Sequence, residues 1–134
     1  MIGKLEGKVL GSFLETIPLE FSIVDVDDKV LAWNRHEGRI FKRPLAALGA
    51  DVRKCHPEES LAKVLQILGE MKQGKRHHAE FWIDLPLGKE GEKNKVLIRY
   101  FALRDESGAY LGCLEVTQNA TYFQKIKGEK RLLD

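Results

Sequence analysis

The sequence contains little cysteine and proline, no long hydrophobic run and no export signal. Its 134 residues include two cysteines, Cys55 and Cys113, and four prolines. One pair of cysteines in a chain without an export signal favours two thiols over a disulfide. The N-terminal stretch Met1–Glu6 lacks the apolar segment of a signal peptide, and every apolar run is too short to span a membrane. We therefore expect a cytoplasmic protein with no membrane partner.

The composition is that of an ordinary soluble domain. Charged residues make up 31% of the chain and hydrophobic residues 43%, and the formal net charge is +2. This excess of positive charge is too small to indicate a nucleic-acid partner. The length allows one buried core, so residues 1–134 are expected to form a single domain.

Three consecutive segments in the second half predict an antiparallel meander. Residues 79–85 alternate apolar and polar side chains, which is typical of a strand with one buried face. Residues 87–94 are polar and rich in glycine, so they predict a solvated loop before a longer strand at 95–104. The turn Asp105–Gly108 leads to a third strand at 110–117. Because the strand at 95–104 carries apolar residues on both faces, both faces of the sheet must be covered.

A hairpin and several helices precede the meander. Residues 19–24 and 29–33 alternate as strands around an aspartate-rich turn, which brings the expected number of strands to five. Residues 44–49 begin with proline and end with glycine, which predicts a short helix. Residues 61–71 place apolar side chains on one face, so they predict the main helix of the domain.

Each end of the chain predicts a further helix. Residues 1–17 carry an apolar stripe at helical spacing, and glycines at 3, 7 and 11 share a second face, where they either admit a close neighbour or weaken the helix. The stripe should dock on the sheet of its own chain or on a second subunit. Residues 119–134 predict a C-terminal helix that begins at a capping box, Thr121 to Gln124, and that is polar on most sides. A core at 18–118 would lie between these two helices.

The order of these elements resembles a PAS domain over nearly the whole chain. Three local matches carry the resemblance: the turn Asp25–Asp28 before a strand ending in Asn34, Gly49 leading to His56-Pro57-Glu58, and the turn Asp105–Gly108 before the last strand. The position of the common Asp-Ile-Thr ending instead has Asn119-Ala120-Thr121, so the exit contact can differ. The resemblance implies an α+β fold: a PAS-like five-stranded antiparallel sheet, with short helices and one longer helix on one face and helices at both ends.

A narrower resemblance concerns the PAS segment at the C-terminus of hemerythrin-like proteins of unknown function. It depends on five stretches of this sequence, and the chain lacks the hemerythrin-like part. The stretches are Lys54-Cys55-His56-Pro57, Gly74-Lys75-Arg76, Ala79-Glu80-Phe81-Trp82-Ile83, Ile98-Arg99-Tyr100-Phe101-Ala102 and Gly128 to Asp134.

These resemblances imply a sensory and signalling module. Such a module would bind a small-molecule ligand, or associate as a homodimer or with a partner signalling domain, or do both, and would pass its signal through the terminal helices. The two apolar sheet faces and the N-terminal stripe favour association, because they are more apolar surface than a monomer of this size should expose.

Cys55 and His56 lie side by side just before the main helix, where PAS domains hold flavin or heme. Either residue could ligate iron, Cys55 as thiolate or His56 as the metal-binding imidazole. In the alternative interpretation, Pro57 occupies the first helical turn and His56 bonds nearby backbone. A minor possibility is a thiol-based redox protein in which His56 lowers the pKa of Cys55.

The remaining candidates line the strand face that should lie opposite the main helix. A planar cofactor, heme first, would lie against Ile98 and Tyr100. Glu115 shares its face with Leu111 and Cys113, and a carboxylate on a covered face must be paired or protonated. Glu115 therefore either forms an ion pair with Arg99 on the neighbouring strand or acts as a switch.

An enzyme is the weaker class. His77 and His78 are adjacent in a strand and so point to opposite faces, which predicts two solvated side chains rather than a metal site. The sequence has no nucleophile with a base at a recognisable spacing, and Gly88–Gly91 lacks the residues that complete a phosphate-binding loop.

Overall fold

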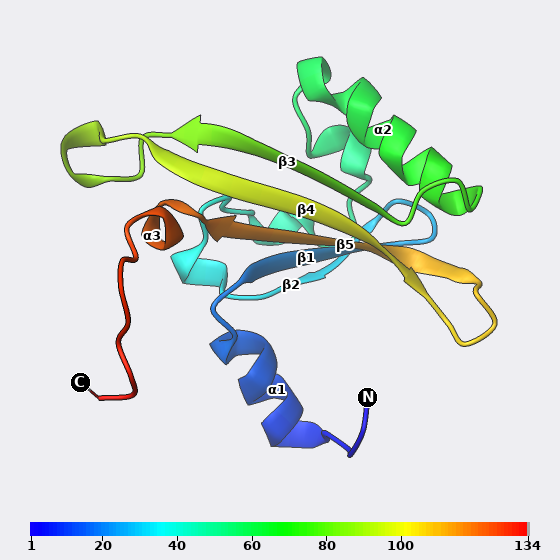
Figure 1. Ribbon diagram of the computed structural model, residues 1–134. Helices are drawn as coiled ribbons and strands as arrows, with labels where there is room; N and C mark the ends of the chain where they lie inside the picture. The colour runs from blue at the N-terminus through cyan, green and yellow to red at the C-terminus, as the bar shows by residue number, and fades with distance from the viewer. Residues whose placement is uncertain (134) are drawn as a thin grey trace.

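The computed structural model describes residues 1–133 and contains one five-stranded antiparallel sheet with its main helix on one face (Figure 1). The strands lie in the order β2-β1-β5-β4-β3, so that β5 is central and β2 and β3 are the edges. The expected α+β fold with five strands is confirmed. The elements are α1 (Gly7–Thr16), β1 (Glu20–Asp25), β2 (Val30–Trp33), the 3-10 helices η1 (His36–Gly38), η2 (Leu45–Ala47) and η3 (Val52–Lys54), α2 (Glu58–Lys72), β3 (His78–Leu85), η4 (Lys89–Gly91), β4 (Asn94–Arg104), β5 (Tyr110–Asn119) and α3 (Thr121–Gln124).

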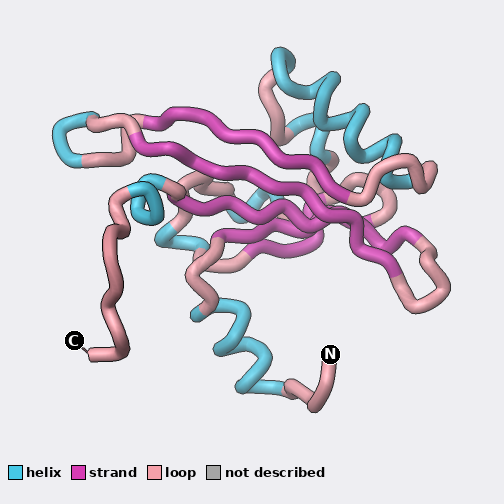
Figure 2. Tube along the Cα trace, in the orientation of Figure 1, coloured by secondary structure: helices cyan, strands magenta, loops and turns pink. Residues whose placement is uncertain are grey.

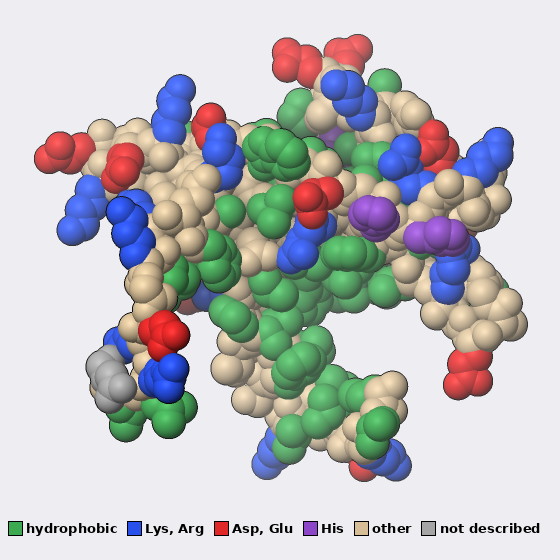
Figure 3. Space-filling view, in the orientation of Figure 1, with side chains coloured by type: hydrophobic (Ala, Val, Ile, Leu, Met, Phe, Trp, Pro, Cys, Tyr) green, Lys and Arg blue, Asp and Glu red, His purple; other side chains and the backbone are tan. Residues whose placement is uncertain are grey.

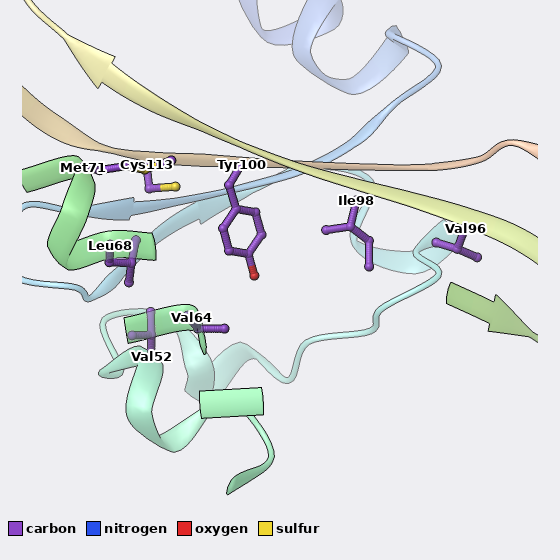
Figure 4. Packing of buried hydrophobic residues seen from close by; sticks show 8 residues of the cluster. All are labelled: Val52, Val64, Leu68, Met71, Val96, Ile98, Tyr100 and Cys113. Carbon is purple, nitrogen blue, oxygen red and sulfur yellow. The ribbon is translucent and has the colours of Figure 1, made fainter. Parts of the chain in front are cut away.

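The core lies between α2 and one face of the sheet, which we call the inner face. Val64, Leu68 and Met71 are the buried residues of α2. They pack in one cluster with Val52 of η3 and with side chains from β4 and β5: Val96, Ile98, Tyr100 and Cys113 (Figure 4). The period of 3.6 in the helix and the period of 2 in the strands bring these positions to one interface.

The helix α2 is longer than the sequence predicts. It begins at Glu58, three residues before the predicted start, with Pro57 as its N-cap residue. Two glutamates, Glu58 and Glu59, fill its first turn, where negative charge is favourable. The apolar period does not reach these residues, and for this reason the pattern placed the start too late.

A buried polar cluster joins the segment after β2 to the start of β1. The Arg39 side chain is fully buried and donates to the carbonyl oxygens of Phe21, Asn34 and Phe41 at 2.8 to 3.0 Å. Glu20 accepts from the backbone of Ile40 and Phe41, and its Oε2 lies 3.8 Å from Arg39 Nη2. Burial lowers the pKa of Arg39, against the raising effect of Glu20. These contacts fix the loop that leads to η2 and the site.

The N-terminal helix is shorter than predicted and does not cover the sheet of its own chain. It spans Gly7–Thr16 and has no buried residue, and it projects away from β1 (Figures 1 and 3). Gly3 and Gly7 have positive φ, so the predicted glycine face is wrong. Asn34 Nδ2 donates to the carbonyl oxygens of Leu14 and Leu19, which ties only the end of α1 to the sheet.

The predicted C-terminal helix is wrong for most of its length. Only Thr121–Gln124 is helical, and the chain beyond it runs as loop up to residue 133 (Figure 2). The predicted capping box does not form, because Thr121 Oγ1 accepts from the backbone N–H of Lys95 at 2.7 Å. The last residue of that prediction, Asp134, lies outside the described residues.

Candidate functional site

A small cavity lies between α2 and the inner face of the sheet. Its volume is about 20 Å³, which is room for roughly one water molecule. Apolar side chains form most of its wall, with polar and charged groups among them. The lining residues are Ser22, Val24, Val30, Arg43, Val52, His56, Val64, Leu68, Tyr100, Cys113 and Glu115.

Arg43 and Glu115 form a nearly buried ion pair in the wall of this cavity. Arg43 Nη2 lies 3.7 Å from Glu115 Oε1, and both side chains are less than one-fifth exposed. Arg43 Nε also donates to Ser22 Oγ at 3.1 Å. The separation of 3.7 Å is too long for a hydrogen bond, so the two charges compensate each other but leave bonding capacity unused.

The predicted ion pair between Arg99 and Glu115 is wrong. Arg99 lies opposite Val116 in the β4–β5 register, whereas Glu115 lies opposite Tyr100. Since successive residues of a strand point to opposite faces, Arg99 and Glu115 are on different sides of the sheet. Arg99 Nη2 instead donates to Gln118 Oε1 at 2.6 Å.

The prediction that Leu111 and Cys113 share one face of the sheet is also wrong. The register of β4 and β5 shifts between Leu103 and Arg104, which pairs Gly112 with Leu103 and Tyr110 with Arg104 and leaves Leu111 unpaired. Such a bulge reverses the alternation of side chains. Leu111 is therefore exposed, while Cys113 is buried.

Tyr100 and Cys113 are held in their neutral forms. Burial raises the pKa of Tyr100 far above its ordinary value, and the charge of Glu115 and a hydrogen bond to it add to the shift. Burial also raises the pKa of the Cys113 thiol to about 12, again with Glu115 as the second cause. A neutral phenol and a neutral thiol beside a carboxylate and a guanidinium can bind a polar ligand but supply no activated nucleophile.

His56 lines the cavity, and Cys55 does not. His56 Nδ1 lies 3.1 Å from the carbonyl oxygen of Val52, so in the neutral ring Nδ1 carries the proton and Nε2 is an acceptor. Cys55 Sγ donates to the carbonyl oxygen of Asp51 at 3.6 Å and is half-buried. Both residues directly follow η3 in the chain. The Asp51 side chain caps the start of η3 by accepting from the backbone N–H of Arg53.

The structure thus brings together four of the residues singled out in the sequence: His56, Tyr100, Cys113 and Glu115. Ile98 is buried in the same core but does not line the cavity. Sequence reasoning missed Arg43 and Ser22. Ser22 could have been found from its place on the same strand face as Val24, but Arg43 lies in a loop, where no period exists to indicate its direction.

A heme does not fit this arrangement. A cavity of about 20 Å³ is far smaller than the several hundred Å³ of typical cofactor sites. His56 Nδ1 is already held by the Val52 carbonyl oxygen, and no group of three or more metal-binding side chains converges among the side chains that the structure describes. Heme at His56 or Cys55 stays a prediction, and it would require α2 to move away from the sheet.

Polar contacts hold the C-terminal end of α2 against the sheet. Lys72 Nζ donates to Asp28 Oδ2 at 2.7 Å, and Arg53 Nη2 lies 3.5 Å from the same oxygen. Arg104 Nη2 donates to the Met71 carbonyl oxygen at 2.6 Å. Asp28 is buried, and its second oxygen, Oδ1, has no hydrogen-bond partner. This end of the helix is therefore fixed by charge as well as by packing.

The sheet, the long helix on its inner face and the cavity beneath that helix define an open α+β fold of the PAS type. The chain belongs to the PAS domain family, whose sequence model matches residues 10–121. None of the curated proteins compared with the chain matches it. No helix within residues 1–133 is long and apolar enough to cross a membrane.

Solved structures share this fold. A C-terminal domain from Streptococcus mutans is 28% identical, with a TM-score of 0.82 over 95% of this chain and 94% of that one. The Vibrio cholerae protein VqmA, in a structure with DPO bound, is 16% identical, with a TM-score of 0.59 over 89% of this chain and 64% of that one. A sensory box sensor histidine kinase from Vibrio cholerae is 14% identical, with a TM-score of 0.57 over 84% and 89%.

Proposed function

We propose that this PAS domain is a sensory and signalling module that takes up a small molecule in the cavity beneath α2. One observation carries the proposal: Arg43, Tyr100, Glu115 and His56 converge on a cavity whose other walls are mostly valine and leucine. A few polar groups in an apolar wall are typical of small-molecule sites. The ligand would therefore be small, largely apolar and equipped with both a donor and an acceptor.

The small volume indicates that α2 must move when a ligand enters. The helix contributes Val64 and Leu68 to the cavity wall, and only three of its residues are buried. A helix with so few buried side chains separates from the sheet at lower cost than a strand leaves its neighbours. Movement of α2 would be the first structural consequence of binding.

Similar proteins support a sensory role. One structural neighbour is a sensor histidine kinase, and another, VqmA, is bound to DPO. Both are less than 25% identical to this chain, so they share the fold and leave the ligand open. DPO is a sensible first probe, together with a panel of small, largely apolar compounds that each carry a hydrogen-bond donor and an acceptor.

The test is thermal unfolding of the full chain with each compound. A compound that binds the cavity should raise the Tm of the wild type in proportion to its concentration. Val64→Phe fills the cavity and should abolish that rise, whereas Leu65→Phe, at a half-buried position outside the cavity, should keep it. If no compound raises the Tm, or if Val64→Phe responds like the wild type, the cavity is not the ligand site.

A thiol enzyme is less well supported. Cys113 is buried with its pKa raised to about 12, and Cys55 bonds a backbone carbonyl rather than His56. Alkylation separates the possibilities: labelling of Cys55 at the rate of a free thiol, or not at all, argues against an activated nucleophile. Rapid labelling that His56→Ala abolishes would support one.

We also propose that α1 joins a second copy of the chain. Val9 is 62% exposed and Phe13 47%, and the chain's own sheet leaves this stripe uncovered. Apolar helix faces of this kind mark association surfaces. Light scattering at micromolar concentration tests the proposal, since deletion of residues 1–14 should lower the apparent mass of the assembly. A wild type that is already monomeric would remove it.

A further inference from the structure

Strand β3 is an uncovered edge of the sheet. It is the last strand in the order β2-β1-β5-β4-β3 (Figure 1), and all of its residues except Ala79 and Leu85 are exposed. It carries large apolar side chains on both faces: Phe81 and Ile83 toward the inner face, 36% and 37% exposed, and Trp82 toward the outer face, 61% exposed. Exposed edges of this kind pair with other strands unless they are protected.

The backbone of β3 directs free donors and acceptors outward at its even-numbered residues. The carbonyl oxygen of His77 accepts from the N–H of Ala102, so these two form a hydrogen-bonded pair between β3 and β4. Hydrogen-bonded pairs alternate along an antiparallel ladder. Odd-numbered residues of β3 therefore bond β4, and residues 78, 80, 82 and 84 direct their N–H and C=O groups away from the sheet.

We propose that β3 pairs with β3 of a second copy, antiparallel, about a two-fold axis at Phe81. Three registers keep most of the strand paired and place the even-numbered residues of one β3 opposite even-numbered residues of the other. An axis at Glu80 places the two Glu80 carboxylates opposite each other, and an axis at Trp82 places Glu80 opposite Asp84. The axis at Phe81 opposes His78 to Asp84 and Glu80 to Trp82, so only this register avoids a like-charge pair. Like charges directly opposite each other are destabilising.

The same register buries the apolar side chains of the inner face. Phe81 meets its own counterpart, and Ile83 meets Ala79. The Phe81 ring also packs edge-on against Tyr100, with ring centroids 5.6 Å apart, and Tyr100 lines the cavity. A second copy at β3 would therefore contact Phe81, which itself packs against a wall residue of the cavity. This contact goes beyond the proposed function and is independent of α1.

Cysteine cross-linking in the full chain tests the register. At the axis, Phe81 and its counterpart form a non-hydrogen-bonded pair with Cα atoms about 4.5 Å apart, which a disulfide can bridge. Ile83 is the matched control, because it has the same exposure and face but lies four positions, roughly 13 Å, from its counterpart.

Under mild oxidation, Phe81→Cys should form a covalent dimer at least tenfold faster than Ile83→Cys. Wild type treated in the same way measures any cross-linking through the native Cys55 and Cys113. Equal rates, or no cross-link in either variant, would overturn the proposal. Deletion of residues 1–14 should leave the cross-link intact. Its loss on deletion would assign the association to α1 instead.

A charge exchange keeps the proposal testable if Phe81→Cys folds poorly. His78→Asp opposes two carboxylates at two symmetric places, so it should raise the dissociation constant of the β3 dimer by about fivefold or more in sedimentation. Adding Asp84→His removes these like-charge pairs and should bring the constant back to within about twofold of the wild type. An unchanged constant in His78→Asp, or no recovery in the double variant, contradicts the register.

Discussion

Arg43 and Glu115 depend on each other because each would otherwise leave a charge in a nearly closed cavity. Removing one partner of a buried ion pair costs more than removing both. Arg43→Met should therefore lower the free energy of unfolding by about 2 kcal/mol, whereas the double variant Arg43→Met with Glu115→Met should recover most of the loss. Urea unfolding measures both.

Arg131 provides the matched control for this prediction. Its ion pair with Glu129 is exposed, and exposed pairs contribute little to stability. Arg131→Met should change the unfolding free energy by less than about 0.5 kcal/mol. An Arg43→Met variant as stable as Arg131→Met would show that the pair in the cavity wall is not a buried interaction.

Cys113 makes stability depend on pH in the alkaline range. Its pKa is raised from 9.0 to about 12 in the folded chain, so the folded state binds more protons than the unfolded state between these values. The stabilisation is complete below pH 9 and is lost as the pH rises toward 12, with a slope of about 1.4 kcal/mol per pH unit. Comparing unfolding free energies of wild type and Cys113→Ala from pH 8 to 11 should show converging curves. Parallel curves would contradict the raised pKa.

At the residue scale, strand positions were predictable and loop positions were not. Alternation along two strands indicated that Tyr100, Cys113 and Glu115 belong to the covered face. The partner of Glu115 was missed because Arg43 lies outside any periodic element, while the adjacent strand offered the plausible but wrong Arg99. A pairing between a strand and a loop depends on the tertiary path of the loop, here fixed by Arg39.

The bulge at Leu111, next to Gly112, sets the alternation of β5 and so the direction of Cys113. A Cβ atom at Gly112 would lie 2.3 Å from the Val24 carbonyl oxygen, and its φ of +149° is one that L side chains rarely adopt. Gly112→Ala should therefore lower the free energy of unfolding by roughly 3 kcal/mol, as measured by urea unfolding.

Gly11 is the control for Gly112. It lies inside α1 in open space with ordinary helical backbone, so Gly11→Ala should increase the helix content in circular dichroism without loss of stability. If the two alanine variants were equally stable, the close approach of β1 and β5 at Gly112 would be wrong.

The chain after α3 should exchange its amide protons freely. Residues 127–133 contain no helix or strand. The Thr121 hydroxyl, which as a helix cap predicted a longer helix, instead accepts a hydrogen bond from the backbone N–H of Lys95. Hydrogen exchange should show no protection there and strong protection in β5. Protection equal to that of β5 would contradict the structure and support the helix predicted at 119–134. Local capping patterns are weak evidence at chain ends, since the same hydroxyl can bond a neighbouring strand.

At the scale of the whole molecule, the PAS fold was predictable because strand alternation, turn residues and the α2 stripe all agree. The path of the two chain ends was less predictable. An amphipathic stripe such as that of α1 indicates that a helix should be buried but not what buries it, and Figure 3 shows hydrophobic side chains on α1 at the surface. Residues 125–133 form no continuous helix in this structure, and the contact surfaces that we propose are α1 and the β3 edge.

The central claim, that the cavity beneath α2 takes up a small molecule, is tested most directly by backbone amide NMR during titration with DPO and the panel of small, largely apolar compounds. At least one compound should shift the resonances of Val52, His56, Val64, Leu68 and Cys113, which all line the cavity, and should leave α1 unchanged. The same compound should produce no such shifts in Val64→Phe. If every compound leaves these five resonances in place, or shifts them equally in Val64→Phe, the proposed sensory site is contradicted.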